Sequence, residues 1–364
     1  MNLVLAHDYL IQMGGAERVV AAMHGAFPDA PIYTSAVRRS GLWSEFQDSS
    51  LKTSWMQHLP MIQHPTHFKV YFALFPLAFR SFGKIDADAA WISSSTFAKF
   101  LRFSPRTRTV CYVHNTTRFL WQTEDYLDYE VGFRPLNRLV RRVLPRLREW
   151  DRRAAARMDV LVANSRNVQN RIRKYYGLDS LVIHPPVETS RFHASAEDDG
   201  SYLIVSRLLG YKNIELPVRA FARSGRRLIV VGDGPYRARL EAMAGPSVTF
   251  CGRLSDPDLH AQYAKCRALV FPGEEDFGIT PVEAMACGKP VVALGRGGAL
   301  ETVVDGKTGT FFSEATEDAL EEAIRRSEGI AWDRDAIRAH AREFSKEAFL
   351  KKMSAVLFAA KAGQ

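Results

Sequence analysis

The 364-residue sequence predicts an α/β protein of two domains, each built on a parallel sheet with helices on both faces. The length exceeds the roughly 250–300 residues at which a single hydrophobic core stops growing. Short, uniformly apolar segments alternate with helical patterns in both halves, which is typical of buried parallel strands. The paired prolines of His184-Pro185-Pro186-Val187 interrupt this alternation and indicate a domain boundary.

We therefore expect an N-terminal domain over residues 1–187, a C-terminal domain over residues 188–344 and a final helix over residues 345–364. The apolar side chains of that helix recur at helical spacing, at Phe349, Met353, Val356 and Leu357. Such a stripe predicts that the last helix packs back on the N-terminal domain.

The second half has the more regular pattern. Strands are predicted at Tyr202–Ser206, Arg227–Val231, Val248–Cys251, Ala268–Phe271, Pro290–Leu294 and Thr310–Phe312. Helices are expected between them, for example at Ile214–Arg223 and Pro281–Ala286. Right-handed crossovers between such strands produce a doubly wound, Rossmann-like sheet.

The first half repeats this theme less regularly. Strands are predicted at Asn2–Ala6, Ala90–Ser93, Thr109–Val113 and Val160–Ala163. A helix is expected from Gly14-Gly15 to Ala26, and a long basic helix from about Pro135 to Arg157. The aromatic-rich stretch from Trp55 to Phe82 shows no pattern that predicts its structure.

The net charge of +9 belongs entirely to the first half. Residues 1–190 hold 25 Lys and Arg against 16 Asp and Glu, whereas the remainder holds 24 of each. The N-terminal half should therefore face an anionic partner, such as a lipid surface, a phosphorylated acceptor or nucleic acid.

Several features predict a cytoplasmic protein. Cys111, Cys251, Cys266 and Cys287 are scattered, without metal-ligand spacing, as expected of reduced thiols. The first residues resemble a strand and lack the basic segment of a signal peptide. No apolar run approaches the roughly 20 residues of a membrane span.

The strongest functional pattern runs from Phe271 to Ala286 and leads from an apolar strand into a helix. Ligands of doubly wound sheets bind at that edge. Gly278 allows close backbone approach, and the N–H groups of Ile279 and Thr280 at the helix start suit a diphosphate. Glu275 and Glu283, one on each side of this turn, can hold hydroxyl groups at two ends of one ligand.

A second pattern follows the predicted strand at Tyr202–Ser206. Arg207 lies at its end, and Lys212 precedes the next helix. Two cations at a strand end can neutralise a leaving diphosphate in place of a metal ion.

These motifs resemble glycosyltransferase family 4, a retaining family with the GT-B fold, in which two Rossmann-like domains face a cleft. Glu275 and Glu283 match its E-x7-E motif, and the segments from Ala286 to Val292 and from Gly297 to Gly309 extend the likeness. The resemblance covers nearly the whole chain and is most specific from Tyr202 to Phe312.

The resemblance implies roles for the C-terminal residues. Glu283 would bind the donor ribose and Glu275 the transferred sugar, with Arg207 and Lys212 at the diphosphate. Backbone groups at Phe277 and Gly278 would contact sugar hydroxyls, and those at Ile279 and Thr280 would contact phosphates. Arg253 and Leu254 are the candidates for reading the base, although the turn there, like Gly232-Asp233-Gly234-Pro235, also suits ordinary turn chemistry.

In the first half, the resemblance turns two weak signals into candidates. Gly14 and Gly15 would admit a phosphate or sugar of the donor near backbone N–H groups. His114 follows a strand and would contact the donor sugar at the reaction centre. The run from His114 to Trp121 resembles a branch of bacterial mannosyltransferases for O-antigen and exopolysaccharide.

The basic helix has two interpretations. Its apolar residues are expected in the core, at Leu136, Leu139, Val143, Leu144, Leu147 and Trp150. Its arginines face outward, at Arg134, Arg138, Arg141, Arg142, Arg146, Arg148, Arg152 and Arg153. They form either a solvated face or, together with the aromatic stretch, a peripheral dock on anionic lipid, worth about 1 kcal/mol per basic residue.

No metal or cofactor is expected. Asp86-Ala87-Asp88, Asp256-Pro257-Asp258 and Asp333-Arg334-Asp335 match the Asp-x-Asp pattern of metal-dependent glycosyltransferases. None of them closes an apolar strand beside the other candidates, so we interpret them as surface or helix-cap residues.

The resulting prediction is a retaining hexosyltransferase that uses GDP-mannose first or a UDP-hexose second. Its acceptor would be a polyprenyl-diphosphate-linked or other glycan in bacterial surface polysaccharide synthesis. One alternative is a nucleotide-sugar epimerase on the same fold. Another is a non-catalytic basic protein that binds RNA or membrane; nucleic acid is not the expected partner, because no recognition motif accompanies the charge.

Overall fold

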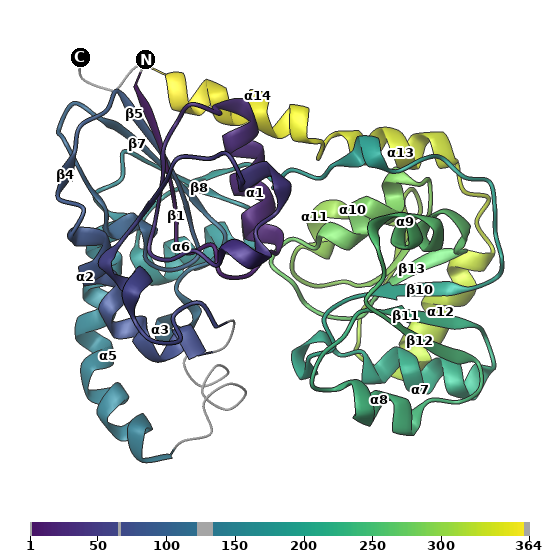
Figure 1. Ribbon diagram of the computed structural model, residues 1–364. Helices are drawn as coiled ribbons and strands as arrows, with labels where there is room; N and C mark the ends of the chain where they lie inside the picture. Colours follow the sequence, from purple (N-terminus) through teal and green to yellow (C-terminus); the bar gives the residue numbers. More distant parts are fainter. Residues whose placement is uncertain (1, 65–66, 122–133, 360–364) are drawn as a thin grey trace. The chain divides into compact units, whose positions relative to one another are not determined.

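The computed structural model describes residues 2–64, 67–121 and 134–359, without the side chains of residues 69 and 134–143. The chain forms two compact units, each with its own parallel sheet (Figure 1). Unit 1 contains the chain up to Pro186 together with the segment from Phe349, and unit 2 extends from Val187 to Ala348.

Unit 1 is built on a seven-stranded parallel sheet in the order β3-β2-β1-β5-β7-β8-β9. The strands are β1 Leu3–His7, β2 Ile32–Thr34, β3 Leu51–Thr53, β5 Ala89–Ser94, β7 Arg108–Val113, β8 Val160–Ala163 and β9 Leu181–Val182. A separate pair joins β4 (Lys84–Ile85) to β6 (Arg102–Phe103). The four predicted strands are confirmed to within one residue, whereas β2, β3 and β9 were missed because they are too short to show a periodic pattern.

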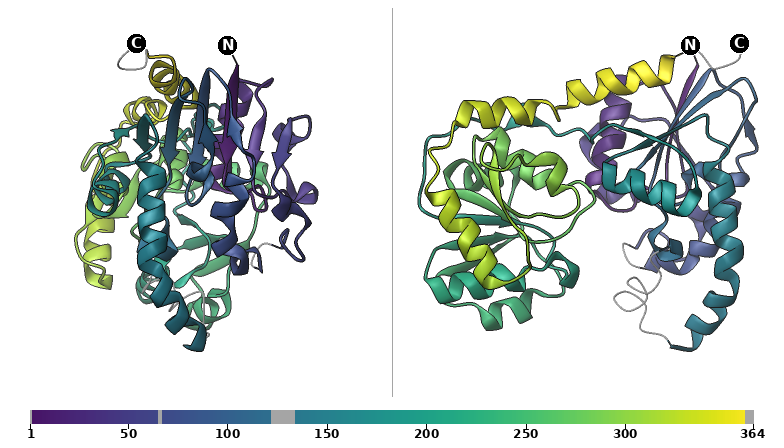
Figure 2. Two further views of the ribbon diagram at one scale, coloured as in Figure 1. Left: turned by 90° about the vertical axis from the view of Figure 1, so that its left-hand side faces the viewer. Right: turned by 180° about the vertical axis from the view of Figure 1, so that it is seen from behind.

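Helices cover both faces of this sheet (Figure 2). One face packs against α1 (Gly15–Ala26) and the part of α14 (Lys346–Phe358) that belongs to unit 1. Phe349 lies there against Trp91 and Tyr112, with ring centroids 5.9 and 5.5 Å apart. The other face packs against α2 Phe75–Arg80, α5 Arg134–Ala155 and α6 Arg166–Tyr176.

The aromatic-rich stretch forms two 3-10 segments, η3 (Trp55–His58) and η4 (His67–Leu74), followed by α2. Its side chains in the core include Met56, Ile62, Phe68, Phe75, Ala78 and Phe79. Its exposed large apolar side chains include Trp55, Met61, Val70 and Leu77. Much of the stretch is therefore core rather than surface.

In α5 the predicted burial of Trp150 is wrong, because this side chain is 41% exposed. The next residue, Asp151, is fully buried and bonded to Lys99, and this pairing sets the rotation of the helix. Leu144 is buried, and Leu147 is half-buried. Arg146, Arg152 and Arg153 are exposed as predicted, whereas Arg148 is half-buried, and the side chains of residues 134–143 lie outside the described residues.

Unit 2 has a six-stranded parallel sheet in the order β12-β11-β10-β13-β14-β15. The strands are β10 Tyr202–Val205, β11 Leu228–Val231, β12 Val248–Gly252, β13 Ala268–Phe271, β14 Val291–Leu294 and β15 Gly309–Phe312. All six were predicted, with ends that differ by one residue at most.

The helices of unit 2 also cover both faces of its sheet (Figure 1). One face carries α9 Asp256–Lys265, α10 Ile279–Ala286, α11 Ala299–Thr302 and α13 Arg334–Arg342. The other carries α7 Glu215–Ser224, α8 Arg237–Met243 and α12 Glu317–Glu328. Residues that alternate along β13 divide between the two cores, with Leu269 on the first face and Val270 on the second.

Candidate active site

The strand order of unit 2 reverses between the neighbouring strands β10 and β13. From β10 the chain proceeds through β11 to β12 on one side, and from β13 through β14 to β15 on the other. Loops that follow strands on the two sides of such a switch point diverge and leave a crevice for ligands. Arg207 and Lys212 follow β10, and Glu275 follows β13, so the two strongest sequence motifs meet at this point.

Lys212 and Glu275 form an ion pair, with Nζ 2.6 Å from Oε1. The Lys212 side chain is 11% exposed and that of Glu275 27%, so the pair is shielded but reachable from solvent. The sequence identified both residues but not their contact. The pair places one cation and one hydrogen-bond acceptor where a diphosphate and a sugar would each need one.

Glycines allow the loops around this pair to pack closely. A Cβ at Gly273 would lie 2.9 Å from the Lys212 carbonyl oxygen, and one at Gly298 would lie 2.3 Å from the Phe277 backbone. The Gly298 N–H donates to the Glu275 carbonyl at 2.8 Å. The backbone on both sides of Glu275 is thus held by its neighbours.

The start of α10 presents backbone N–H groups beside the pair. Gly278 precedes the helix at φ +84°, and among the described residues no side chain caps its first turn. Ile279 and Thr280 begin the helix, while the Phe277 ring is buried against Phe344. A helix start whose N-cap glycine offers no side-chain acceptor, and whose dipole end is positive, favours an anion such as a phosphate.

We expect Gly278→Ala to destabilise the protein by about 1–3 kcal/mol, because alanine is strained at positive φ and its Cβ would lie 2.8 Å from the Phe271 ring. Urea unfolding measures the change. Gly225→Ala is the matched control, since Gly225 also has positive φ but a Cβ there would have no atom within 4 Å. Equal losses in the two variants would show that the Phe271 contact costs nothing.

Glu283 lies one turn into α10 and is 4% exposed. Tyr263 of α9 donates its hydroxyl hydrogen to Glu283 Oε2 at 2.7 Å. Burial and the Glu283 carboxylate raise the pKa of Tyr263, so the phenol stays protonated and remains a donor. Sequence reasoning missed Tyr263, because nothing in its spacing from Glu283 signals a contact between two helices.

The other predicted residues of unit 2 follow further strands at the same edge. Arg207 is exposed directly after β10, and no ion pair holds it among the described residues. Arg253 is exposed after β12, whereas Leu254 is half-buried against the core. Because β12 lies three strands from β13, these two residues are about 14 Å along the edge from the Glu275 loop.

Gly14, Gly15 and His114 belong to unit 1. Gly14 has extended backbone angles and precedes α1, in which Gly15 is the first residue. A Cβ at Gly14 would lie 3.3 Å from the Glu17 carboxylate, so this glycine leaves room for a buried acid as well as for a ligand. His114 follows β7 and is half-buried, with Nε2 2.8 Å from Ser93 Oγ.

Asp8, which sequence analysis did not single out, organises the same edge of unit 1. Its carboxylate is 1% exposed and accepts backbone N–H bonds from Ser95 to Ala98 at 2.6 to 2.9 Å. Burial alone would raise the pKa of Asp8, but the His7 charge and these N–H donors lower it. The carboxylate therefore stays ionised and holds the loop after β5.

The Asp-x-Asp segments lie elsewhere. Asp86 pairs with Arg106, Asp333 caps α13, and Asp256 and Asp258 lie in the first turn of α9. Over the described ranges, no three acidic, histidine or cysteine side chains gather as a metal-ion site. Nor does any helix within them have the length and apolar character needed to cross a membrane.

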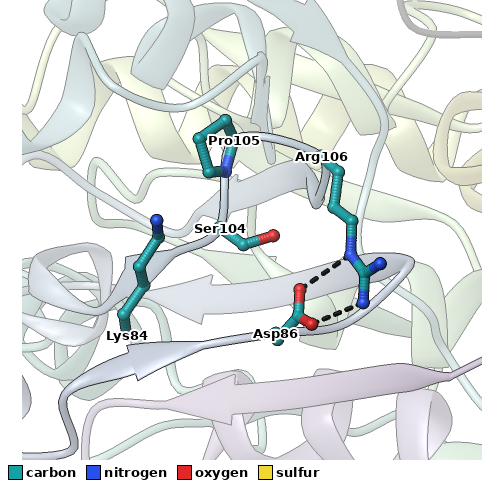
Figure 3. A pocket seen from close by; sticks show the side chains of 5 residues that line it. All are labelled: Lys84, Asp86, Ser104, Pro105 and Arg106. Carbon is teal, nitrogen blue, oxygen red and sulfur yellow. Dashed lines mark hydrogen bonds and ion pairs between the residues drawn. The ribbon is translucent and has the colours of Figure 1, made fainter.

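An open hollow of about 450 Å³ is lined by Lys84, Asp86, Ser104, Pro105 and Arg106 (Figure 3). Asp86 precedes β5 and Arg106 precedes β7. The hollow therefore lies at the amino ends of these strands, opposite the edge at which parallel sheets bind ligands. We do not assign the candidate site to it.

Comparisons with known proteins agree with the two-domain α/β fold. The family described as "Glycosyltransferase Family 4" matches residues 13–191, and that described as "Glycosyl transferases group 1" matches residues 187–344. A GDP-mannose-dependent alpha-(1-6)-phosphatidylinositol monomannoside mannosyltransferase of Mycolicibacterium smegmatis is 26% identical over 355 residues, covering 88% of this chain and 87% of that protein. The alpha-1,3/1,6-mannosyltransferase ALG2 of Kluyveromyces lactis is 25% identical, covering 80% and 69%.

Solved structures share the architecture. HepE of Anabaena, crystallised with UDP and glucose, superposes with a TM-score of 0.71 at 19% identity and covers 99% of this chain and 100% of its own. Sucrose-phosphate synthase of Thermosynechococcus elongatus has a TM-score of 0.70 at 18% identity, with 98% of both chains covered. The fold is thus GT-B. Together, the two family matches span both units and the motifs described above, and the chain belongs to glycosyltransferase family 4.

Proposed function

We propose that this glycosyltransferase moves mannose from GDP-mannose to a saccharide carried on a polyprenyl diphosphate, with retention of anomeric configuration. The observation that carries the proposal is the Lys212–Glu275 pair beside the uncapped start of α10. The name of the M. smegmatis relative specifies GDP-mannose, and ALG2 is named a mannosyltransferase, which supports GDP-mannose as the donor. A UDP-hexose is the second candidate, favoured by the HepE structure with UDP and glucose.

The proposed chemistry relies on charge placed where the leaving group develops it. Lys212, Arg207 and the N–H groups at the start of α10 stabilise the departing diphosphate, so these groups supply the charge that a metal ion supplies in other enzymes. Glu275 accepts hydrogen bonds from hydroxyls of the transferred sugar. Breaking the ion pair by donor phosphate frees Glu275 for this role, so donor binding and sugar positioning are coupled.

Glu283 is proposed to hold the ribose. One carboxylate oxygen accepts the Tyr263 hydroxyl hydrogen, which fixes the side chain, and a carboxylate has further acceptor sites for ribose hydroxyls. His114 is proposed to contact the sugar from unit 1. Arg253 and Leu254 would border the base.

The acceptor is proposed to be held at a membrane. The excess positive charge of residues 1–190 supports this, as do the exposed Arg146, Arg152 and Arg153 on α5. Trp150 is exposed on the same helix and lies under the Arg80 guanidinium, 5.8 Å from the ring centroid. The name of the M. smegmatis relative specifies a phosphatidylinositol-based acceptor, which is also a lipid. A role in surface polysaccharide synthesis follows from such an acceptor.

A thermal-shift panel with GDP, UDP, ADP and their sugar conjugates, run with and without EDTA, tests the donor. We expect GDP and GDP-mannose to raise the melting temperature, by the equivalent of about 2.7 kcal/mol at a hundredfold excess over Kd. Glu283→Gln should abolish the shift, because the amide keeps one acceptor for Tyr263 but loses a carboxylate oxygen for ribose. Glu322→Gln, on the exposed side of α12, is the control and should retain it.

Three other results would change the proposal. A response to uridine ligands alone would replace GDP-mannose with a UDP-hexose. A shift that disappears in EDTA would contradict metal independence. No shift with any nucleotide would overturn the donor site itself.

A further inference from the structure

Four polar side chains of unit 1 form a continuous chain that ends at His114. Glu17 Oε1 lies 3.5 Å from His7 Nε2, and His7 Nδ1 lies 3.0 Å from Ser93 Oγ. Ser93 Oγ in turn lies 2.8 Å from His114 Nε2. Glu17, His7 and Ser93 are at most 4% exposed, so water does not compete for these contacts.

Backbone pairing holds this chain at the switch point of the first sheet. His7 and Ser93 are paired residues at the ends of the neighbouring strands β1 and β5. The His114 N–H donates to the Ser94 carbonyl at 3.0 Å, and Asn164 Nδ2 donates to the His114 carbonyl at 3.0 Å. The spacing of the two rings and the hydroxyl between them is therefore set by the sheet.

The partners of His7 require Nδ1 to be a donor and place a carboxylate beside Nε2. Nδ1 also lies 3.2 Å from the Ser93 carbonyl oxygen, which can only accept. Nε2 makes no hydrogen bond within the described part of the chain, and it lies at ion-pair distance from the Glu17 carboxylate. His7 therefore fits this site as an imidazolium.

The charges around His7 agree with this protonation state. Glu17 and Asp8 face the ring, and Tyr9 and His114 are its aromatic neighbours, both with centroids 6.4 Å away. Burial would lower the pKa of His7, but Glu17 and Asp8 raise it above its ordinary value. These two carboxylates thus favour the protonated ring over the neutral one.

A cationic His7 decides the direction of the next hydrogen bond. Because His7 Nδ1 donates toward Ser93, the single hydroxyl hydrogen of Ser93 is left for His114. His114 Nε2 can then accept this hydrogen, and a neutral imidazole that accepts at Nε2 carries its proton on Nδ1.

We propose that Glu17, His7 and Ser93 are positioning residues that hold His114 neutral, with its proton on Nδ1, so that His114 acts on the donor sugar as a hydrogen-bond donor. The part that concerns the sugar rests on the proposed function. The tautomer does not, because it is argued from contacts within unit 1 alone. We call Glu17, His7 and Ser93 the relay; none of these three residues needs to touch the substrate.

Long-range ¹H–¹⁵N correlation spectra of the full-length, ligand-free protein with ¹⁵N-labelled histidine test the tautomer. The His114 signals are assigned by their loss in His114→Gln. We expect a protonated Nδ1 and an unprotonated Nε2 at neutral pH, together with a doubly protonated His7. Protonation of His114 on Nε2 in the unaltered protein would overturn the proposal.

Variants separate a relay from simple packing. Ser93→Ala should give a mixture of His114 tautomers, and Ser93→Thr, which keeps the hydroxyl, should restore the Nδ1 form. Glu17→Gln should lower the pH at which His7 loses its second proton. Ser95→Ala removes a hydroxyl outside the chain and should change neither signal; an unchanged His114 tautomer in Ser93→Ala would contradict the relay.

Measuring kcat of the Ser93 variant tests whether the His114 tautomer matters for the reaction. Ser93→Ala should lower kcat by about 10-fold, the value of one hydrogen bond, with little change in GDP affinity because the proposed nucleotide site is in unit 2. An unchanged kcat would limit the relay to structure and overturn its role toward the sugar. Failure of the proposed donor function would appear separately, as the absence of any nucleotide shift with the tautomer intact.

Discussion

Lys212→Ala is expected to lower kcat by about 10²–10³-fold, the usual effect of removing one group that stabilises developing charge. The ammonium lies 2.6 Å from Glu275 and, in the proposed reaction, moves to the leaving diphosphate. Since that interaction is strongest in the transition state, kcat and kcat/KM should fall together. Steady-state kinetics with GDP-mannose measure both constants.

Two comparisons make this expectation specific. Lys307→Ala removes an exposed lysine in a turn of unit 2 and should leave kcat unchanged. Thermal melts of Lys212→Ala show whether the fold survives loss of the ion pair. If the melt is preserved and kcat stays within about threefold, Lys212 is not the cation of the diphosphate site.

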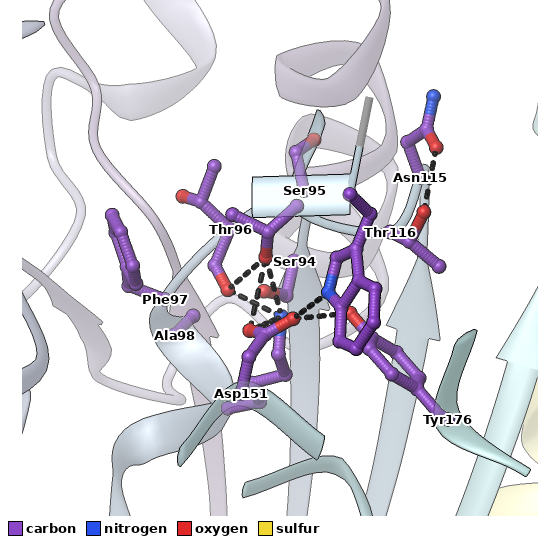
Figure 4. Close-up of polar contacts among 12 residues, drawn as sticks. Ser94, Ser95, Thr96, Phe97, Ala98, Asn115, Thr116, Asp151 and Tyr176 are labelled. Atoms are coloured by element: carbon purple, nitrogen blue, oxygen red, sulfur yellow. Dashed lines mark hydrogen bonds and ion pairs between the residues drawn. The ribbon is translucent and has the colours of Figure 1, made fainter. Parts of the chain in front are cut away.

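Asp151→Ala is expected to reduce the free energy of unfolding by about 3–5 kcal/mol, as for other buried ion pairs that lose one partner. The Asp151 carboxylate is fully buried at the centre of a network that includes Tyr176 (Figure 4). It accepts bonds from Lys99 at 2.9 Å, Thr117 at 3.0 Å, Trp121 at 2.8 Å and Tyr176 at 2.8 Å. Urea unfolding followed by circular dichroism measures the loss.

The physical reason is the charge that remains. Lys99 is 2% exposed. Burial lowers the pKa of its ammonium, but the Asp151 carboxylate raises that pKa by more than burial lowers it, so Lys99 stays charged in the folded protein. The double variant Lys99→Met/Asp151→Leu should recover stability relative to Asp151→Ala, because it leaves no buried charge.

Glu149→Ala on the same helix is the control. Its ion pairs with Arg152 and Arg153 are solvent-exposed, so its loss should be much smaller. A similar loss in Glu149→Ala and Asp151→Ala would show that helix α5 is sensitive to any change, and the network would not be its anchor.

Strand positions were largely predictable because parallel strands buried on both faces are uniformly apolar. Val160–Ala163 and Ala268–Phe271 were predicted with their observed bounds. The short strands β2, β3 and β9 were not, since two or three residues carry too little periodicity. The prediction for Trp150 failed for a different reason. Its apolar side chain predicted burial, but the neighbouring Asp151 is buried instead, where it pairs with Lys99.

The candidate site likewise contains residues that the sequence could predict and residues that it could not. The strand, glycine and helix start around Glu275 and Glu283 form one continuous segment, so local sequence located them. Tyr263 and the relay from Glu17 to Ser93 carry no such signal, because each contact joins separate elements. Their roles depend on strand register and helix packing, which a single sequence does not display.

The two α/β domains and the loops that carry the donor motifs could be predicted from the sequence, because backbone periodicity and turn chemistry are local, and the motifs in those loops resembled the family. The charge pairings became visible only in the folded chain: Lys212 with Glu275, Lys99 with Asp151, and His7 with Glu17 and Ser93. Such contacts are fixed by desolvation and sheet register between segments far apart in the chain, so no local stretch of sequence contains them.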